Sequence, residues 1–81
     1  MSPTIAALNV LNDLVNVCRD LLKVALRRGR RDIAARLSII ASQLDATRTR
    51  LVQDGREYID TAWSFIDAGR VAIRNYRMVL A

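Results

Sequence analysis

The stretch ALNVLNDLVNVCRDLLKVA, residues 7–25, decides the fold. Its apolar side chains recur with the spacing 4-3-4-3-4, which aligns them along one face of an α-helix. This first stripe consists of Ala7, Leu11, Leu14, Cys18, Leu21 and Ala25. Upstream, Ser2-Pro3 is typical of a helix start, and downstream Gly29 suits a left-handed C-terminal cap. The sequence therefore predicts a first helix over about residues 3–28.

The same spacing returns twice further along the chain. A second helix is predicted over about residues 32–53, with Asp32 as its N-cap and Gly55 as the break after it. Asp54-Gly55-Arg56-Glu57 has the spacing of a capping box, which predicts a third helix over about residues 56–80. The second stripe consists of Ile33, Leu37, Ile40, Leu44, Thr47 and Leu51, and the third of Tyr58, Ala62, Phe65, Gly69, Ala72, Tyr76 and Val79.

These helices predict one all-α domain over residues 1–81, an up-down-up three-helix bundle, because short connections make sequential helices antiparallel neighbours. The alternative is a helical hairpin in which helices two and three are continuous, since one glycine costs a helix only about 1 kcal/mol. The phase of the stripes favours three helices. Extending the second stripe beyond Leu51 would put Asp54 on the next apolar position.

The small size of the chain suggests a partner. A domain of this length buries only about 60–65% of the surface of its unfolded chain, so its core is thin. Cys18 is the only cysteine and cannot form an internal disulfide, and the lack of histidine argues against a zinc site. The remaining way to supplement such a core is a partner, which includes a second copy of the chain.

The sequence offers little for catalysis. Without histidine it has no ordinary general base near neutral pH, and Cys18 in an apolar stripe behaves as a small hydrophobe. Asp54, Glu57 and Asp60 cluster where carboxylates favour the start of a helix. We therefore expect no enzymatic activity, no catalytic or metal site, no cofactor and no small-molecule substrate.

The first predicted helix is apolar over a wider arc than a core-facing helix needs. Either it is wedged between the other two helices, or it offers a second apolar face to another molecule. For the second case the candidate self-association residues are Leu8, Val10, Val15, Val17, Leu22 and Val24.

An excess of arginine at one end of the predicted bundle is the strongest binding signal. The up-down-up topology brings residues 17–42 and 68–81 together in a half with ten basic and two acidic residues, a net charge of +8. The other half has three basic and six acidic residues, a net charge of −3. Candidate residues for binding an anionic partner are Arg27, Arg28, Arg30, Arg31, Arg36, Arg70, Arg74 and Arg77.

Helix dipoles explain only part of this asymmetry. Basic residues near helix C-termini are favourable, which accounts for Arg27, Arg28 and Arg77. Arg30 and Arg31 lie at or before a predicted N-terminus, where positive charge is unfavourable. Binding of phosphates or of an acidic protein surface is the other explanation.

Three functions are compatible with these features. The first is a protein-interaction or assembly subunit that forms a homo-oligomer or docks a protein partner. The second is a nucleic-acid-binding protein that uses its arginines on phosphates with little sequence preference. The third and weakest is a membrane-surface protein, because the lysine-rich polar face typical of that class is missing. Asp13, Arg19, Asp20 and Lys23 interrupt the only long apolar stretch, so we expect a soluble, cytoplasmic protein.

Overall fold

The computed structural model describes residues 2–81 and places almost all of them in helices. Helix α1 spans Pro3–Arg27, α2 spans Arg31–Asp54 and α3 spans Ile59–Leu80, with a short 3-10 helix, η1, at Gly55–Tyr58. No strand occurs among the described residues. The all-α class predicted from the sequence is therefore confirmed.

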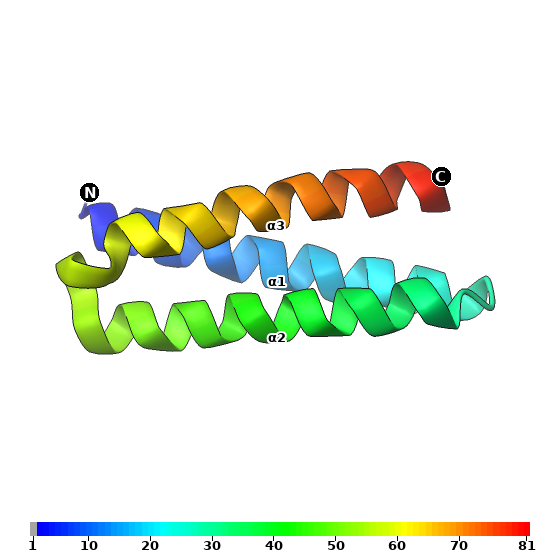
Figure 1. The fold of residues 1–81 in the computed structure, drawn as a ribbon, viewed down its shortest axis with the longest axis horizontal. Helices are drawn as coiled ribbons and strands as arrows, with labels where there is room; N and C mark the ends of the chain where they lie inside the picture. The colour runs from blue at the N-terminus through cyan, green and yellow to red at the C-terminus, as the bar shows by residue number, and fades with distance from the viewer. Residues whose placement is uncertain (1) are drawn as a thin grey trace.

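The direction of the chain reverses twice, so that α1, α2 and α3 lie side by side and each packs against the other two (Figure 1). The hairpin alternative is right in one respect, because the chain stays helical without interruption from Arg31 to Leu80. That run is not one straight rod. A straight helix of its length would measure about 75 Å, whereas the whole body measures 40 × 18 × 16 Å. The second reversal lies at η1, between α2 and α3.

Glycines with positive φ make both reversals, Gly29 at 69° and Gly55 at 61°. At the end of α1, the N–H of Gly29 donates to the carbonyl of Leu26 at 3.1 Å, and the N–H of Arg30 donates to the carbonyl of Ala25 at 2.8 Å. This pair of bonds is the Schellman pattern, which satisfies carbonyls that the helix itself leaves free. The predicted cap at Gly29 is therefore confirmed.

The predicted N-terminal caps are wrong. Helix α2 begins at Arg31 with Arg30 at the N-cap, and Asp32 lies inside the first turn, where its carboxylate accepts two bonds from Arg30 at 3.2 and 3.1 Å. Asp54 is the last residue of α2 and its carboxylate accepts from Arg50, so no capping box forms. Because η1 uses the following four residues for the turn, α3 begins three residues later than predicted.

The start of α1 follows the prediction only in part. Pro3 is the first helical residue, but the side chain of Ser2 makes no capping bond. Instead the carbonyl of Ser2 accepts from the N–H of Ala6 at 3.0 Å. The preset φ of proline and this first backbone bond therefore start the helix.

The core is formed by stripes from all three helices. The stripes predicted for α1 and α2 are buried or half-buried throughout. The stripe predicted for α3 is right only in part, because Phe65 and Val79 are 44% and 56% exposed while its other residues are buried or half-buried. Ala62 and Gly69 of that stripe are buried as predicted, and the other buried residues of α3 are Ile66, Ile73 and Leu80. One polar side chain in the core, Thr47, is satisfied by donating to the carbonyl of Gln43 at 2.8 Å.

The lone thiol supports a test of this core. Cys18 is fully buried, and burial raises the pKa of its thiol. We expect a thiol reagent to label native protein at least about a hundredfold more slowly than protein in denaturant, because labelling requires opening of the core.

The buried thiol also predicts a pH dependence. Since the thiol of the unfolded chain ionises first, the free energy of unfolding should fall as the pH rises above the ordinary thiol pKa. Chemical denaturation of wild type and Cys18→Ala across that range checks this, and an equal pH dependence of both would contradict it.

Candidate interaction surfaces

The apolar face of α1 is used inside the protein. Among the six residues predicted for self-association, Val15 is 2% exposed and the others are half-buried. Leu8, Val10 and Val17 pack against the core that α1, α2 and α3 share, and Leu22 and Val24 pack against the cluster around Leu37. These contacts use part of the apolar surface of α1, and the role of the six residues in self-association stays a prediction. Helix α1 is wedged between its two neighbours, which explains its wide apolar arc.

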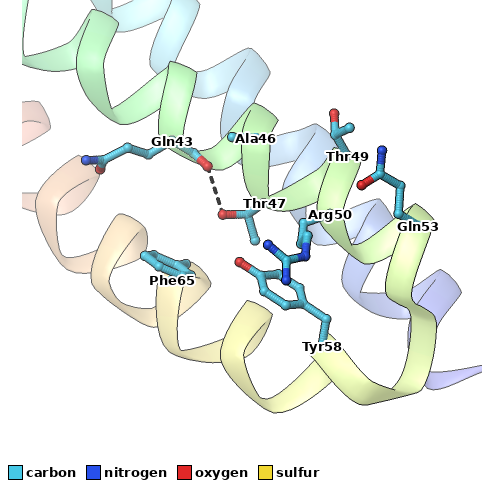
Figure 2. Close-up of a pocket in the computed structure, with 8 residues that line it drawn as sticks. All are labelled: Gln43, Ala46, Thr47, Thr49, Arg50, Gln53, Tyr58 and Phe65. Atoms are coloured by element: carbon cyan, nitrogen blue, oxygen red, sulfur yellow. Dashed lines mark hydrogen bonds between the residues drawn. The ribbon is translucent and has the colours of Figure 1, made fainter.

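An open groove lies between α2 and α3. At the end near η1 it widens into a hollow of about 470 Å³, lined by α2, by Tyr58 and by Phe65 (Figure 2). The hollow continues along α3 into a second one of about 160 Å³, and Gln43 and Phe65 line both. Along the η1 and α3 side, the groove runs from Tyr58 to Ala72, a length of about four helical turns.

Small side chains make the middle of the groove shallow and let the helices approach closely. A Cβ added at Gly69 would lie 3.1 Å from a methyl carbon of Leu44. Ala68 and Ala72 flank Gly69 on the groove side of α3, and Ile40 faces them from α2. The floor of the groove is therefore apolar.

Phe65 stands at the edge of this floor with 44% of its surface exposed. Figure 2 shows its ring between α3 and the side chains of α2, on the same side of the groove as Tyr58. The guanidinium of Arg50 lies 5.3 Å from the centre of the Tyr58 ring and also binds Asp54. The α2 rim of the groove therefore carries the ion pair of Arg50 and Asp54. The α3 rim carries Phe65, whose side chain is partly exposed.

Sequence reasoning missed the groove, although the sequence contains a signal for it. Helix α3 carries adjacent apolar residues at Phe65-Ile66, Ala72-Ile73 and Val79-Leu80. The second member of each pair is buried, whereas Phe65 and Val79 are exposed and Ala72 is half-buried. Two parallel apolar columns on one helix therefore indicate two packing surfaces, of which the core uses one.

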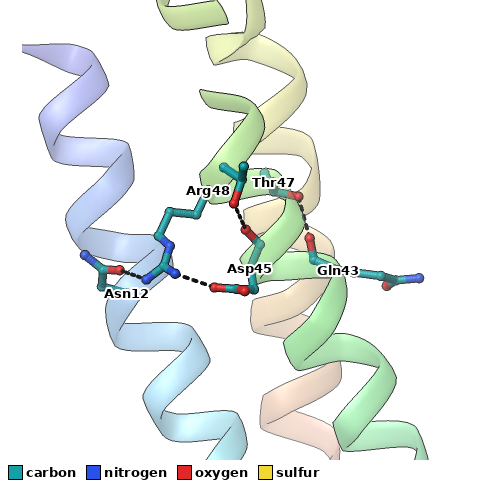
Figure 3. Close-up of polar contacts among 6 residues, drawn as sticks. Asn12, Gln43, Asp45, Thr47 and Arg48 are labelled. Atoms are coloured by element: carbon teal, nitrogen blue, oxygen red, sulfur yellow. Dashed lines mark hydrogen bonds and ion pairs between the residues drawn. The ribbon is translucent and has the colours of Figure 1, made fainter. Parts of the chain in front are cut away.

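On its other side, α2 is joined to α1 by a polar contact (Figure 3). The guanidinium of Arg48 donates to Asn12 of α1 at 2.8 Å and to Asp45 of α2 at 2.5 Å. These are exposed or half-exposed groups, so the contact orients the two helices more than it stabilises them. We find no comparable side-chain hydrogen bond between α2 and α3 among residues 2–81.

Seven of the eight arginines predicted for the pole lie nearest one end of the molecule, in the adjoining halves of the helices or in the connection between α1 and α2, whereas Arg70 lies at the middle of α3. The connection between α1 and α2 and the end of α3 occupy that end (Figure 1). All eight predicted residues are exposed: Arg27, Arg28, Arg30, Arg31, Arg36, Arg70, Arg74 and Arg77. We call residues 17–42 and 68–81 the basic half and the remainder the acidic half. Their net charges of +8 and −3 lie at opposite ends of a 40 Å body.

Few of these arginines have a carboxylate partner. Arg30 binds Asp32, whose pKa it lowers by hydrogen bonding, and Arg70 lies 3.8 Å from Asp67 and over the ring of Trp63. In the part of the chain that the structure describes, the other six arginines of the pole make no ion pair. Their charge is therefore available to an anionic partner.

Residues 2–81 contain no group of three or more side chains that could hold a metal ion. Within the same residues, each helix is too short or too polar to cross a bilayer. Comparison of the chain with models of protein families, with curated proteins and with solved structures gives no match.

Proposed function

We propose that this protein, a bundle of three helical segments, is a non-enzymatic assembly subunit that acts by self-association or by docking a protein partner. The observation that carries the proposal is the open apolar groove between α2 and α3, with Phe65 exposed at its edge. Exposed apolar surface that is concave and continuous is typical of interaction sites. Association also supplements the thin core of a small domain.

Self-association is the form of this function that we expect to see first. Light scattering on a sizing column at moderate salt should give a multiple of the 9.1 kDa chain mass. Phe65→Asp should shift that mass to the monomer, because a charge in the groove would lose its hydration on association. The matched control is Val71→Asp. Val71 is also exposed on α3, 55% against 44% for Phe65, but it lies about 120° around the helix from Phe65.

The light-scattering masses of the two variants locate the interface. Loss of association in Phe65→Asp with retention in Val71→Asp supports the groove as the interface. Equal association in both variants places the interface elsewhere. A wild-type chain that stays monomeric at every concentration contradicts assembly by this protein alone.

A second function is supported by the arginine pole, namely binding of nucleic acid without sequence preference. Its supporting observation is the six exposed arginines without an ion pair at one end of the bundle. Phosphate binding of this kind releases counterions and weakens steeply with salt. The two functions are compatible, because the groove lies along the side of the molecule and the pole at its end.

A further inference from the structure

We propose that the groove between α2 and α3 binds the same groove of a second copy, with the two chains antiparallel and related by a twofold axis near Gly69. This inference rests on the proposed assembly function and names its partner and geometry. Three independent observations support it: the shape of the groove, the charge of the two halves and the dimensions of the body.

The groove surface is complementary to itself. Measured along the axis of α3, Phe65 lies about 6 Å on the N-terminal side of Gly69, and Ala72 lies about 4.5 Å on its C-terminal side. A twofold axis at that level reverses the direction of the second chain. Phe65 of the partner subunit then arrives close to the level of Ala72, where small side chains leave the hollow of about 160 Å³. Each subunit thus supplies one aromatic side chain and one shallow hollow, as an isologous interface requires.

The charges favour the antiparallel orientation over the parallel one. Antiparallel chains place the basic half, net +8, beside the acidic half of the other chain, net −3. Parallel chains would place the two basic halves side by side. At physiological salt, interactions between exposed charges are screened beyond about 8 Å, so only charges near the contact contribute to the binding energy. These charges select the orientation of the two chains more than they raise the affinity.

The dimensions of the body favour a contact along its side. A stable interface buries about 800 Å² per partner, and a long face of this body offers on the order of 700 Å² in projection. An end of the body, 18 × 16 Å, offers less than half of that. A contact through the poles is therefore too small, whereas a whole long side reaches the lower part of the range of stable interfaces, about 600–1,000 Å² per partner.

Disulfide trapping tests the geometry. Single cysteines are introduced at Ala68, at Val79 and at Asn16 in a Cys18→Ala background. Ala68 lies within about 1.5 Å of the axis level, whereas Val79 lies about 15 Å from it, so the two copies of residue 79 would be about 30 Å apart. A disulfide requires Cα atoms within about 7 Å. We expect Ala68→Cys to form a covalent dimer under mild oxidation, and Val79→Cys and the exposed Asn16→Cys on α1 to remain uncrosslinked.

The crosslinking results separate the orientation of the two chains from the location of the interface. Crosslinking at both 68 and 79 would overturn the antiparallel orientation, because side-by-side parallel chains bring both positions to their own copies. Failure at 68 in a protein whose light-scattering mass is dimeric would overturn the groove as interface and leave the assembly function standing. A monomeric wild type contradicts both. If Cys18→Ala lowers the helical content, the same cysteines are tested with Cys18 retained, because its buried thiol does not compete.

Discussion

Leu11→Ala should lower the free energy of unfolding by about 2–5 kcal/mol, the range for removing a buried leucine from a packed core. Leu11 is fully buried in the cluster where α1 meets both other helices. A domain of this size is stabilised by only about 0.05–0.15 kcal/mol per residue, so the loss is a large share of the total. The melting temperature should fall by roughly 10–30 °C.

The matched control is Leu26→Ala on the same helix. Leu26 is 54% exposed, and its replacement should change the free energy of unfolding by less than about 1 kcal/mol. Both variants are melted at the same protein concentration, because association makes the melting temperature depend on concentration. Similar losses in the two variants would contradict the packing of α1 between α2 and α3.

The sequence predicts most of the fold because its signals are local. The stripe of α2 is clear because polar residues separate its apolar columns on most of its surface. The stripe of α1 is recognisable from its regular 4-3-4-3-4 spacing. Gly29 is recognisable as a cap because a left-handed residue at that place has few alternatives to glycine. The wedge position of α1 also follows from its sequence, as one of two explanations for its wide apolar arc.

The phase of α3 could be predicted only in part, because two adjacent apolar columns fit the same periodicity. Phe65 and Ile66 are equally apolar, and only the positions of α1 and α2 determine that Ile66 turns inward. The N-terminal caps failed for a related reason. Asp32 and Asp54 are suitable capping residues, but Arg30 and Arg50 bind their carboxylates instead. Competition between partners is a property of the folded arrangement, which residue type alone does not reveal.

The arginine pole and the groove between α2 and α3 also differ in how far the sequence predicts them. The position of the arginine pole depends only on the order and direction of the helices, so the sequence was sufficient to predict that position, and its binding role stays a prediction. The groove depends on how deeply α3 sits between its neighbours. Gly69 sets that depth by its contact with Leu44, and such a contact between distant residues has no signature in either segment alone.

Replacing Arg28, Arg31, Arg74 and Arg77 with glutamine should remove most of the affinity for polyanions. These four arginines are exposed and make no ion pair within residues 2–81, so glutamine removes charge without breaking an internal contact. Each phosphate contact contributes about −0.9 to the slope of log K against log salt on duplex DNA. The slope should therefore become shallower by up to about 3.6 units, as measured by fluorescence anisotropy with a labelled duplex.

A matched pair of variants separates the position of the charge from its amount. Arg77→Gln removes one charge from the basic half, and Arg56→Gln removes one from the acidic half; both side chains are exposed and make no ion pair within residues 2–81. If the pole binds phosphate, the first variant should reduce the slope by about 0.9 and the second should leave it almost unchanged. Equal effects would mean that net charge alone attracts the duplex. In that case the clustered arginines would serve to orient neighbouring subunits. The basic half of one subunit, with its net charge of +8, repels the basic half of another and attracts its acidic half.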